Sequence, residues 1–187
     1  MTARMRQYCP GEPIDNQKSG RKSLVPMKPE ISRILRQFKQ HHPHYLAQSS
    51  LAAAATALVL LVVGVEHAFI VGSMGSTAFT VFAMPGNVTA QPRNVLGGHL
   101  TGLACGLLHT LIPFSNPYLE ILGLAPTVGL AMFIMVALDF EHPPAAGTAL
   151  GAAISGYTRH VILTVIVGSL VFVIMHRALK RWMHDLV

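Results

Sequence analysis

The feature that most constrains this chain is a long central stretch, residues 48–176, almost free of basic charge. Of the 14 lysines and arginines, nine lie in residues 1–47, three lie in the last eleven residues, and only Arg93 and Arg159 fall between. Four apolar runs occupy the stretch, at 48–65, 95–112, 120–138 and 160–178. Each has about the 18–20 residues that a helix needs to cross ~30 Å of hydrocarbon. The sequence therefore predicts an all-α polytopic membrane protein with four long transmembrane helices.

The two basic ends predict how the chain is placed in the membrane. Positive charge concentrates on the cytoplasmic side of membrane proteins, so both termini are expected in the cytoplasm of a bacterium, with the spans in its plasma (inner) membrane. Residues 1–29 read as a disordered basic tail, 30–44 as an interfacial helix and turn, 45–178 as the transmembrane domain and 179–187 as a second basic tail. No aromatic–basic interleaving accompanies the net charge of +6, which argues against nucleic acid as a partner.

Residues 30–40 have the pattern of an amphipathic helix. Ile31, Ile34, Leu35 and Phe38 recur at helical spacing, with basic residues opposite. Such a helix suits the inner leaflet, and an ordinary helix docked on the membrane domain fits equally well. The following HHPHY, residues 41–45, is predicted to be a turn before the bilayer.

Two short segments between the long runs, 72–84 and 145–156, are rich in Gly, Ala, Ser and Thr. They are too short and too polar to face lipid comfortably, so we expect broken or re-entrant helices. Both cytoplasmic ends require an even number of crossings. Four spans with two re-entrant segments satisfy this requirement, as do six crossings of which two are short.

The surroundings of the two short segments resemble each other and suggest an internal two-fold repeat, as in small transporters. The order in both halves is an apolar span, Glu-His, a segment with Thr-Ala, Arg-x-Val and a second span. The matching residues are Glu66-His67 and Glu141-His142, Thr77-Ala78 and Thr148-Ala149, and Arg93-Asn94-Val95 and Arg159-His160-Val161.

The segment EHPP, residues 141–144, predicts a helix stop and restart. Neither Pro143 nor Pro144 can continue the preceding helix, but either can begin a new one. His142 would then lie near the N-cap, and free N–H groups of the first helical turn would favour a small anion. These groups belong to Ala145, Ala146 and Gly147. The alternative is a plain helix break without a ligand.

The segment GSMGSTAF, residues 72–79, allows the same interpretation, with Ser73 or Ser76 as the helix cap. The hydroxyls of Thr77 and Thr148 could line a site between the two segments, or bond back to their own helices. Arg93 could attract an anion, pair with a nearby carboxylate of Glu66, Asp139 or Glu141, or extend to the interface.

Glycines at four-residue spacing predict close helix packing. They are Gly98, Gly102 and Gly106 in the second long run, and Gly147 and Gly151 in the second short segment. The partner helix could belong to the same chain or to another copy. Recognisable catalytic and metal motifs do not occur, and His99 and His109 lie on different faces of one helix. We therefore expect no enzyme activity, no cofactor and no metal.

Three segments together resemble the signatures of the HPP family of integral membrane proteins. They are GSMGSTAF (72–79), QPRNVLGGHLTG (91–102) and EHPPAAGTAL (141–150), and the resemblance covers about residues 45–178. Members are described as four-span proteins, and relatives in chloroplasts and cyanobacteria act as nitrite transporters. The resemblance implies a membrane protein for a small solute, with nitrite as the suggested substrate.

The residues and the resemblance together predict a homo-oligomeric transporter or channel for a small inorganic anion. The substrate-binding residues would be His142, Pro143, Pro144, Thr148, Ser76, Thr77 and Arg93. The competing hypothesis is a non-transporting scaffold or assembly protein that binds a partner through its glycine-rich helix faces.

Overall fold

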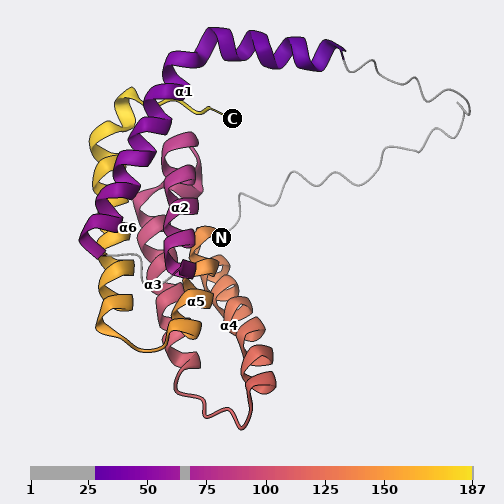
Figure 1. Cartoon of the computed structure of the whole chain (residues 1–187), viewed down its shortest axis with the longest axis vertical. Coiled ribbons are helices and arrows are strands. Elements are labelled where there is room, and N and C mark those ends of the chain that lie inside the picture. The colour runs from indigo at the N-terminus through magenta and orange to yellow at the C-terminus, as the bar shows by residue number, and fades with distance from the viewer. Residues whose placement is uncertain (1–27, 64–67, 187) are drawn as a thin grey trace, which may run out of the picture. The chain divides into compact units, whose positions relative to one another are not determined.

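The computed structural model describes residues 28–63 and 68–186, and these form helices without any strand. This result confirms the predicted all-α class. The α-helices, shown in Figure 1, are α1 (Lys28–Val63), α2 (Ala68–Ala83), α3 (Pro92–His109), α4 (Pro117–Ala137), α5 (Pro144–Ser155) and α6 (Arg159–Leu179). Two short 3-10 turns, η1 (Val88–Ala90) and η2 (Lys180–Trp182), accompany them. Contacts divide the chain between Lys39 and Gln40, and the site discussed below lies entirely in the second unit.

Three of the described helices are long and apolar enough to cross a membrane: Pro43–Leu61 within α1, α4, and α6 extended to Trp182. The prediction of four long spans is therefore not confirmed, because α3 is not among these helices. Its 18 residues include Asn94, His99 and His109, all of which are buried. Because α3 packs against α4, α5 and α6, and His99 also contacts Thr77 of α2, these polar side chains face protein instead of lipid.

Some local predictions fall outside the described residues, and one is wrong. Glu66, His67 and the N-terminal tail lie outside the described part, as do the side chains of the amphipathic face at 31–38. The turn predicted at 41–45 does not form, since α1 continues through Pro43. A long helix can pass through a proline when it forgoes one backbone hydrogen bond. The internal repeat stays a prediction.

The helix break before α5 lies at Asp139, before the two prolines in the sequence. The chain reverses at Asp139, which has a positive φ of 57°. The N–H of Phe140 donates to Met135 O at 3.1 Å, and the N–H of Asp139 donates to Val136 O at 3.3 Å. This is a Schellman-type helix end, with Phe140 packed beside Met135 in one apolar cluster. Pro144 then begins α5, in the position that proline favours at a helix start.

Helix α5 packs against both α2 and α3, and successive helices run in opposite directions (Figure 1). At one end, Leu186 N–H donates to Ala83 O at 2.8 Å, beside the α2–α3 connection. At the other end, the start of α2 packs on α5, where a Cβ on Gly151 would lie 3.1 Å from the nitrogen of Ile70. Thus α2 is one continuous helix of 16 residues that runs from its contact with α5 at Ile70 to its contact with the C-terminal segment at Ala83.

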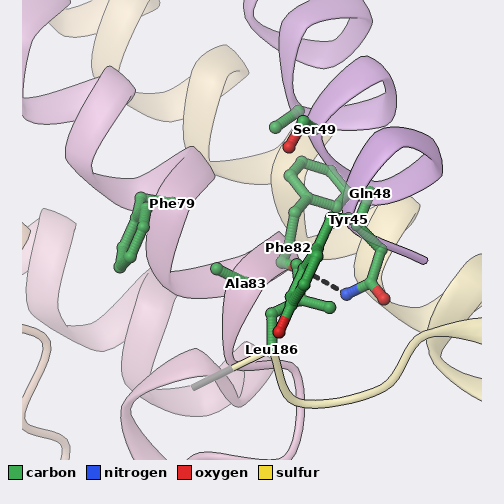
Figure 2. A pocket seen from close by; sticks show the side chains of 8 residues that line it. Tyr45, Gln48, Ser49, Phe79, Phe82, Ala83 and Leu186 are labelled. Atoms are coloured by element: carbon green, nitrogen blue, oxygen red, sulfur yellow. Dashed lines mark hydrogen bonds between the residues drawn. The ribbon is translucent and has the colours of Figure 1, made fainter. Parts of the chain in front are cut away.

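The C-terminal segment is fastened to the start of the apolar part of α1. The amide nitrogen of buried Gln48 donates to Phe82 O and, at 2.8 Å, to His184 O, while His184 N–H donates to Gln48 Oε1 at 3.2 Å. An apolar cavity of about 270 Å³ is lined by Gln48, Tyr45 and Leu186, among others. Figure 2 shows these side chains and the bond from Gln48 to Phe82. These bonds hold Gln48 of α1 beside His184. The chain between these two residues therefore passes along the helix bundle an even number of times.

The predicted glycine faces pack inside the chain. A Cβ on Gly98 would lie 2.6 Å from His142 Cβ, one on Gly102 2.3 Å from Ala145 O, and one on Gly106 2.5 Å from Ala152 Cβ. Helix α3 therefore contacts α5 along all three glycines. On the opposite face of α5, a Cβ on Gly147 would lie 3.3 Å from Ser73 Cβ, and Gly151 faces Ile70. Because these faces are already occupied, they are not open to a separate partner.

Candidate functional site

A cluster of five polar side chains lies in the interior, where α2, α3, α5 and the segment before α5 meet. We refer to it as the buried polar cluster: Ser73, Thr77, His99, His142 and Thr148. Four of the five side chains are fully buried, and Ser73 is 5% exposed. Polar groups that are buried in this way require hydrogen-bond partners, and each of these side chains has at least two.

The hydroxyl of Thr77 is the centre of the buried polar cluster. Its Oγ1 lies 2.8 Å from His99 Nε2 and 3.1 Å from His142 Nε2. The same hydroxyl lies 3.0 Å from the carbonyl oxygen of Ser73 on its own helix. The two imidazole rings are 4.9 Å apart between centroids, in an edge-to-face arrangement. Both rings therefore converge on one oxygen atom.

The direction of the other hydrogen bonds follows from two backbone carbonyls, which can only accept. Ser73 Oγ donates to Pro144 O at 2.7 Å, and His142 Nδ1–H donates to Thr89 O at 2.8 Å. Since Ser73 has used its hydrogen, Thr148 Oγ1 donates to Ser73 Oγ at 2.7 Å. His99 Nδ1–H must then donate to Thr148 Oγ1 at 2.8 Å. This accounting assigns the hydrogen of both neutral rings to Nδ1.

Small residues allow the elements to bring these side chains together. Ser73 and Thr77 are four residues apart, so they share one face of α2. Gly98 lets α3 approach the Cβ of His142 closely, and Gly147 leaves room for Ser73. A larger side chain at either glycine would separate the helices that supply the buried polar cluster.

The structure brings together some of the predicted site residues and separates others. Thr77, His142 and Thr148 belong to the buried polar cluster, and Pro144 contributes its carbonyl oxygen. Pro143 is exposed at the start of α5. Ser76 is exposed on α2, where its carbonyl accepts from Thr80 Oγ1.

Arg93 lies outside the buried polar cluster. Its guanidinium donates to Leu138 O at 3.0 Å and lies 3.7 Å from the carboxylate of Asp139. The Arg93 side chain is 65% exposed, so this pair is a surface contact of small energetic weight. Of the alternatives weighed from the sequence, the pairing with a nearby carboxylate is the one observed.

We predicted free N–H groups at the start of α5 that could bind an anion, and this prediction is wrong for the first two of them. The N–H of Ala145 donates to His142 O at 2.9 Å, and that of Ala146 donates to Pro143 O at 3.1 Å. Tight turns of this kind satisfy the first N–H groups of a helix internally, so they are not free for an anion. The caps predicted at Ser73 or Ser76 are also wrong, because both residues lie inside α2.

Two members of the buried polar cluster, His99 and Ser73, were not predicted as site residues. The spacing along α3 relates His99 only to His109, whereas the partners of His99, Thr77 and Thr148, lie on other helices. The one local signal is the position of His99 among the glycines of an apolar run. Such a histidine must be paired inside the protein or face water.

A second polar region lies at the other end of α3 and α5. A cavity of about 290 Å³ is bordered there by His109, Thr110, Glu120, Ser155 and Gly156, among others. His109 stacks on Phe114 and lies 3.0 Å from Thr127 Oγ1 through its Nδ1. Among the described residues, no three His, Cys, Asp or Glu side chains are grouped as a metal site requires.

Three membrane-length helices around a core with buried polar side chains define the class of this molecule, a helical membrane protein. Residues 39–185 match the transmembrane region of the HPP family, and the chain belongs to this family.

Two curated relatives are transmembrane proteins of Dictyostelium discoideum. One is 32% identical over 95 residues, which cover 50% of this chain and 30% of the relative. The other is 30% identical over 82 residues, which cover 43% of this chain and 28% of the relative. The match thus spans less than a third of either relative's length. No solved structure matches the chain.

Proposed function

We propose that this membrane protein transports a small inorganic anion, as a carrier or channel rather than as an enzyme, with nitrite as the first substrate to test. The observation that carries the proposal is the buried polar cluster, which joins two short helices to the interrupted segment between α4 and α5. Short and interrupted helices that turn polar groups inward are a feature of transporters. The choice of an anion, and of nitrite, rests on the resemblance to HPP proteins that move nitrite.

The proposal includes membrane placement and assembly. Both ends of the domain would face the cytoplasm of a bacterial cell, since the basic residues concentrate there. Large apolar side chains on α4, such as Phe133 at 69% exposure, would contact lipid or a second copy of the chain. Because each chain has few helices, a homo-oligomer would enclose the path of the solute more completely. The alternative, a scaffold that binds a partner through its glycine-rich helix faces, is less favoured because these faces pack within the chain.

Uptake into liposomes tests the transport proposal. We expect the purified full chain to take up nitrite, and His142→Ala to reduce the uptake at least about tenfold, the effect of ~1.4 kcal/mol on a rate. The substitution removes the donor to Thr89 O and one of the two rings on Thr77. The matched control is Arg93→Gln, which we expect to retain near wild-type uptake because Arg93 lies outside the buried polar cluster.

The identity of the transported solute and the role of the buried polar cluster are tested by different outcomes. No uptake of nitrite, nitrate, formate or chloride would contradict the anion proposal. Uptake that His142→Ala leaves unchanged would contradict the role of the buried polar cluster while leaving the transport function intact.

We also expect six crossings, because α2 is one continuous helix of 16 residues from its contact with α5 at Ile70 to its contact with the C-terminal segment at Ala83. With cytoplasmic ends, residue 88 should then lie in the cytoplasm and residue 116 outside. Four crossings with two re-entrant segments reverse both positions. Reporter fusions at residues 88 and 116, one active only inside and one only outside the cell, distinguish the two topologies. An external signal at 88 would rule out six crossings.

A further inference from the structure

The buried polar cluster contains fewer hydrogens than hydrogen-bond contacts. Seven contacts join its five side chains to one another and to three backbone carbonyls. When all five side chains are neutral, each brings a single N–H or O–H hydrogen. Two of the seven contacts therefore have no hydrogen between their heavy atoms.

The shortage is located at Thr77. The other four hydrogens are committed in one direction, starting from the carbonyls of Pro144 and Thr89. The remaining hydrogen is that of the Thr77 hydroxyl, which has three acceptors within 3.1 Å: Ser73 O, His99 Nε2 and His142 Nε2. At least one imidazole lone pair is consequently buried against an oxygen atom without a hydrogen, which is unfavourable.

One additional hydrogen completes both contacts between Thr77 and the two rings, and leaves only the contact between Thr77 Oγ1 and Ser73 O without a hydrogen. Placed on His99 Nε2, it donates to Thr77 Oγ1, whose own hydrogen can then point to His142 Nε2. The reverse arrangement, with the added hydrogen on His142, is related to the first by transfer of one hydrogen along each contact. The Thr77 hydroxyl thus connects two equivalent sites for the same hydrogen.

We propose that His99, Thr77 and His142 form a binding site for a single proton in the interior of the membrane domain. The proton comes from water, forms an N–H bond at Nε2 of either ring and is exchanged between the rings through the Thr77 hydroxyl. A proton fits where a larger solute does not. The side chains contact one another at 2.7–3.1 Å, and all three residues of the site are fully buried.

The site holds one proton because two charged rings would repel each other. Their centroids are 4.9 Å apart, and in a medium of low dielectric constant such a pair of like charges is strongly unfavourable. Even the first charge is costly to bury. The extra hydrogen bond at Thr77 offsets part of that cost, so the proton is expected to bind in acidic conditions or together with an anion nearby.

The described ionisable groups near the two rings provide no permanent negative charge to balance a bound proton. Helices α2 and α5 contribute no ionisable side chain, α6 contributes none from Val161 to Met175, and α4 none after Glu120. The ionisable residues on α3 and the segment before α5 are Arg93, Cys105, His109, Asp139 and Glu141. None of these five is hydrogen-bonded to either ring through its side chain in the described structure. Asp139 is instead paired with Arg93.

Nitrogen-15 NMR of the full chain in lipid nanodiscs tests the proposal without any transported solute. The chemical shifts of a histidine distinguish its two neutral tautomers from the charged ring. At about pH 8 we expect both His99 and His142 to carry the hydrogen on Nδ1. On acidification to about pH 3, both rings should respond together to the uptake of one proton, because the pair titrates as a unit. Spectra of His99→Phe and His142→Phe identify the two sets of signals.

Two variants test the part that Thr77 plays. Thr77→Ser keeps the hydroxyl and should retain the joint response, whereas Thr77→Val should make each ring titrate separately. An Nε2–H tautomer on either ring of the wild-type protein at about pH 8 would overturn the proposal, as would separate titration of the two wild-type rings. Failure of nitrite uptake would leave the proton site untouched, since the NMR readout involves no anion.

Discussion

Gly102→Ala should lower the free energy of unfolding by about 2–3 kcal/mol, the usual cost of overpacking a well-packed interior. The added Cβ would lie 2.3 Å from Ala145 O and 3.2 Å from the nitrogen of Ala149. Both atoms are backbone, so no side-chain rotation can relieve the contact and α3 must move away from α5. The higher helix propensity of alanine returns at most ~1 kcal/mol. Thermal unfolding in detergent measures the difference.

Gly129→Ala is the matched control for this measurement. Gly129 is also in a long helix, α4, but a Cβ there would meet no atom within 4 Å. We expect this variant to be as stable as the wild type or more stable by up to ~1 kcal/mol, from helix propensity alone. Equal stability of Gly102→Ala and the wild type would mean that α3 and α5 are farther apart than described.

Thr77→Val should be the second large effect, with a loss of about 1–3 kcal/mol in the free energy of unfolding. Valine has a similar shape but no hydroxyl, so the one imidazole nitrogen, His99 Nε2 or His142 Nε2, that accepts the Thr77 hydrogen would lose its donor. Each buried acceptor left without a partner costs ~1–3 kcal/mol. Chemical unfolding in detergent, monitored by circular dichroism, gives the difference, and Thr77→Ser should restore most of the stability.

Thr164→Val separates this effect from the general cost of removing a buried threonine hydroxyl. Thr164 is 4% exposed, and its Oγ1 donates to His160 O of its own helix at 2.7 Å. That carbonyl lies within a helix and does not depend on the side chain, so we expect a loss below ~1 kcal/mol. A loss as large as that of Thr77→Val would contradict the special position of Thr77.

The helices were predictable where local signals mark their ends. Proline after Asn116 begins α4, and Asn116 Oδ1 accepts from Leu119 N–H at 3.0 Å. The short segments predicted at 72–84 and 145–156 correspond to α2 at 68–83 and α5 at 144–155. The position of the break before α5 was harder to predict, because the reversal at Asp139 requires a positive φ that few residues other than glycine adopt.

The candidate site was only partly predictable because its contacts join four separate parts of the chain. Thr77, Thr148 and His142 could be selected as polar residues in apolar or broken segments. The pairing of His99 with two threonines depends on how α2, α3 and α5 are arranged, which no local pattern specifies. Arg93 was expected near the site because it is one of two basic residues in the central stretch. Its pairing with Asp139 holds it at the surface.

The glycine spacing of α3 has a consequence for helix register. Gly98, Gly102 and Gly106 recur every fourth residue, and the facing Ala145 and Ala149 on α5 have the same spacing. A slide of α5 by one helical turn, ~5.4 Å, would exchange each glycine–alanine contact for a nearly identical one. Apolar packing alone therefore distinguishes poorly between neighbouring registers. The hydrogen bond from His99 to Thr148 forms in only one of them, so the buried polar cluster selects the alignment of the two helices.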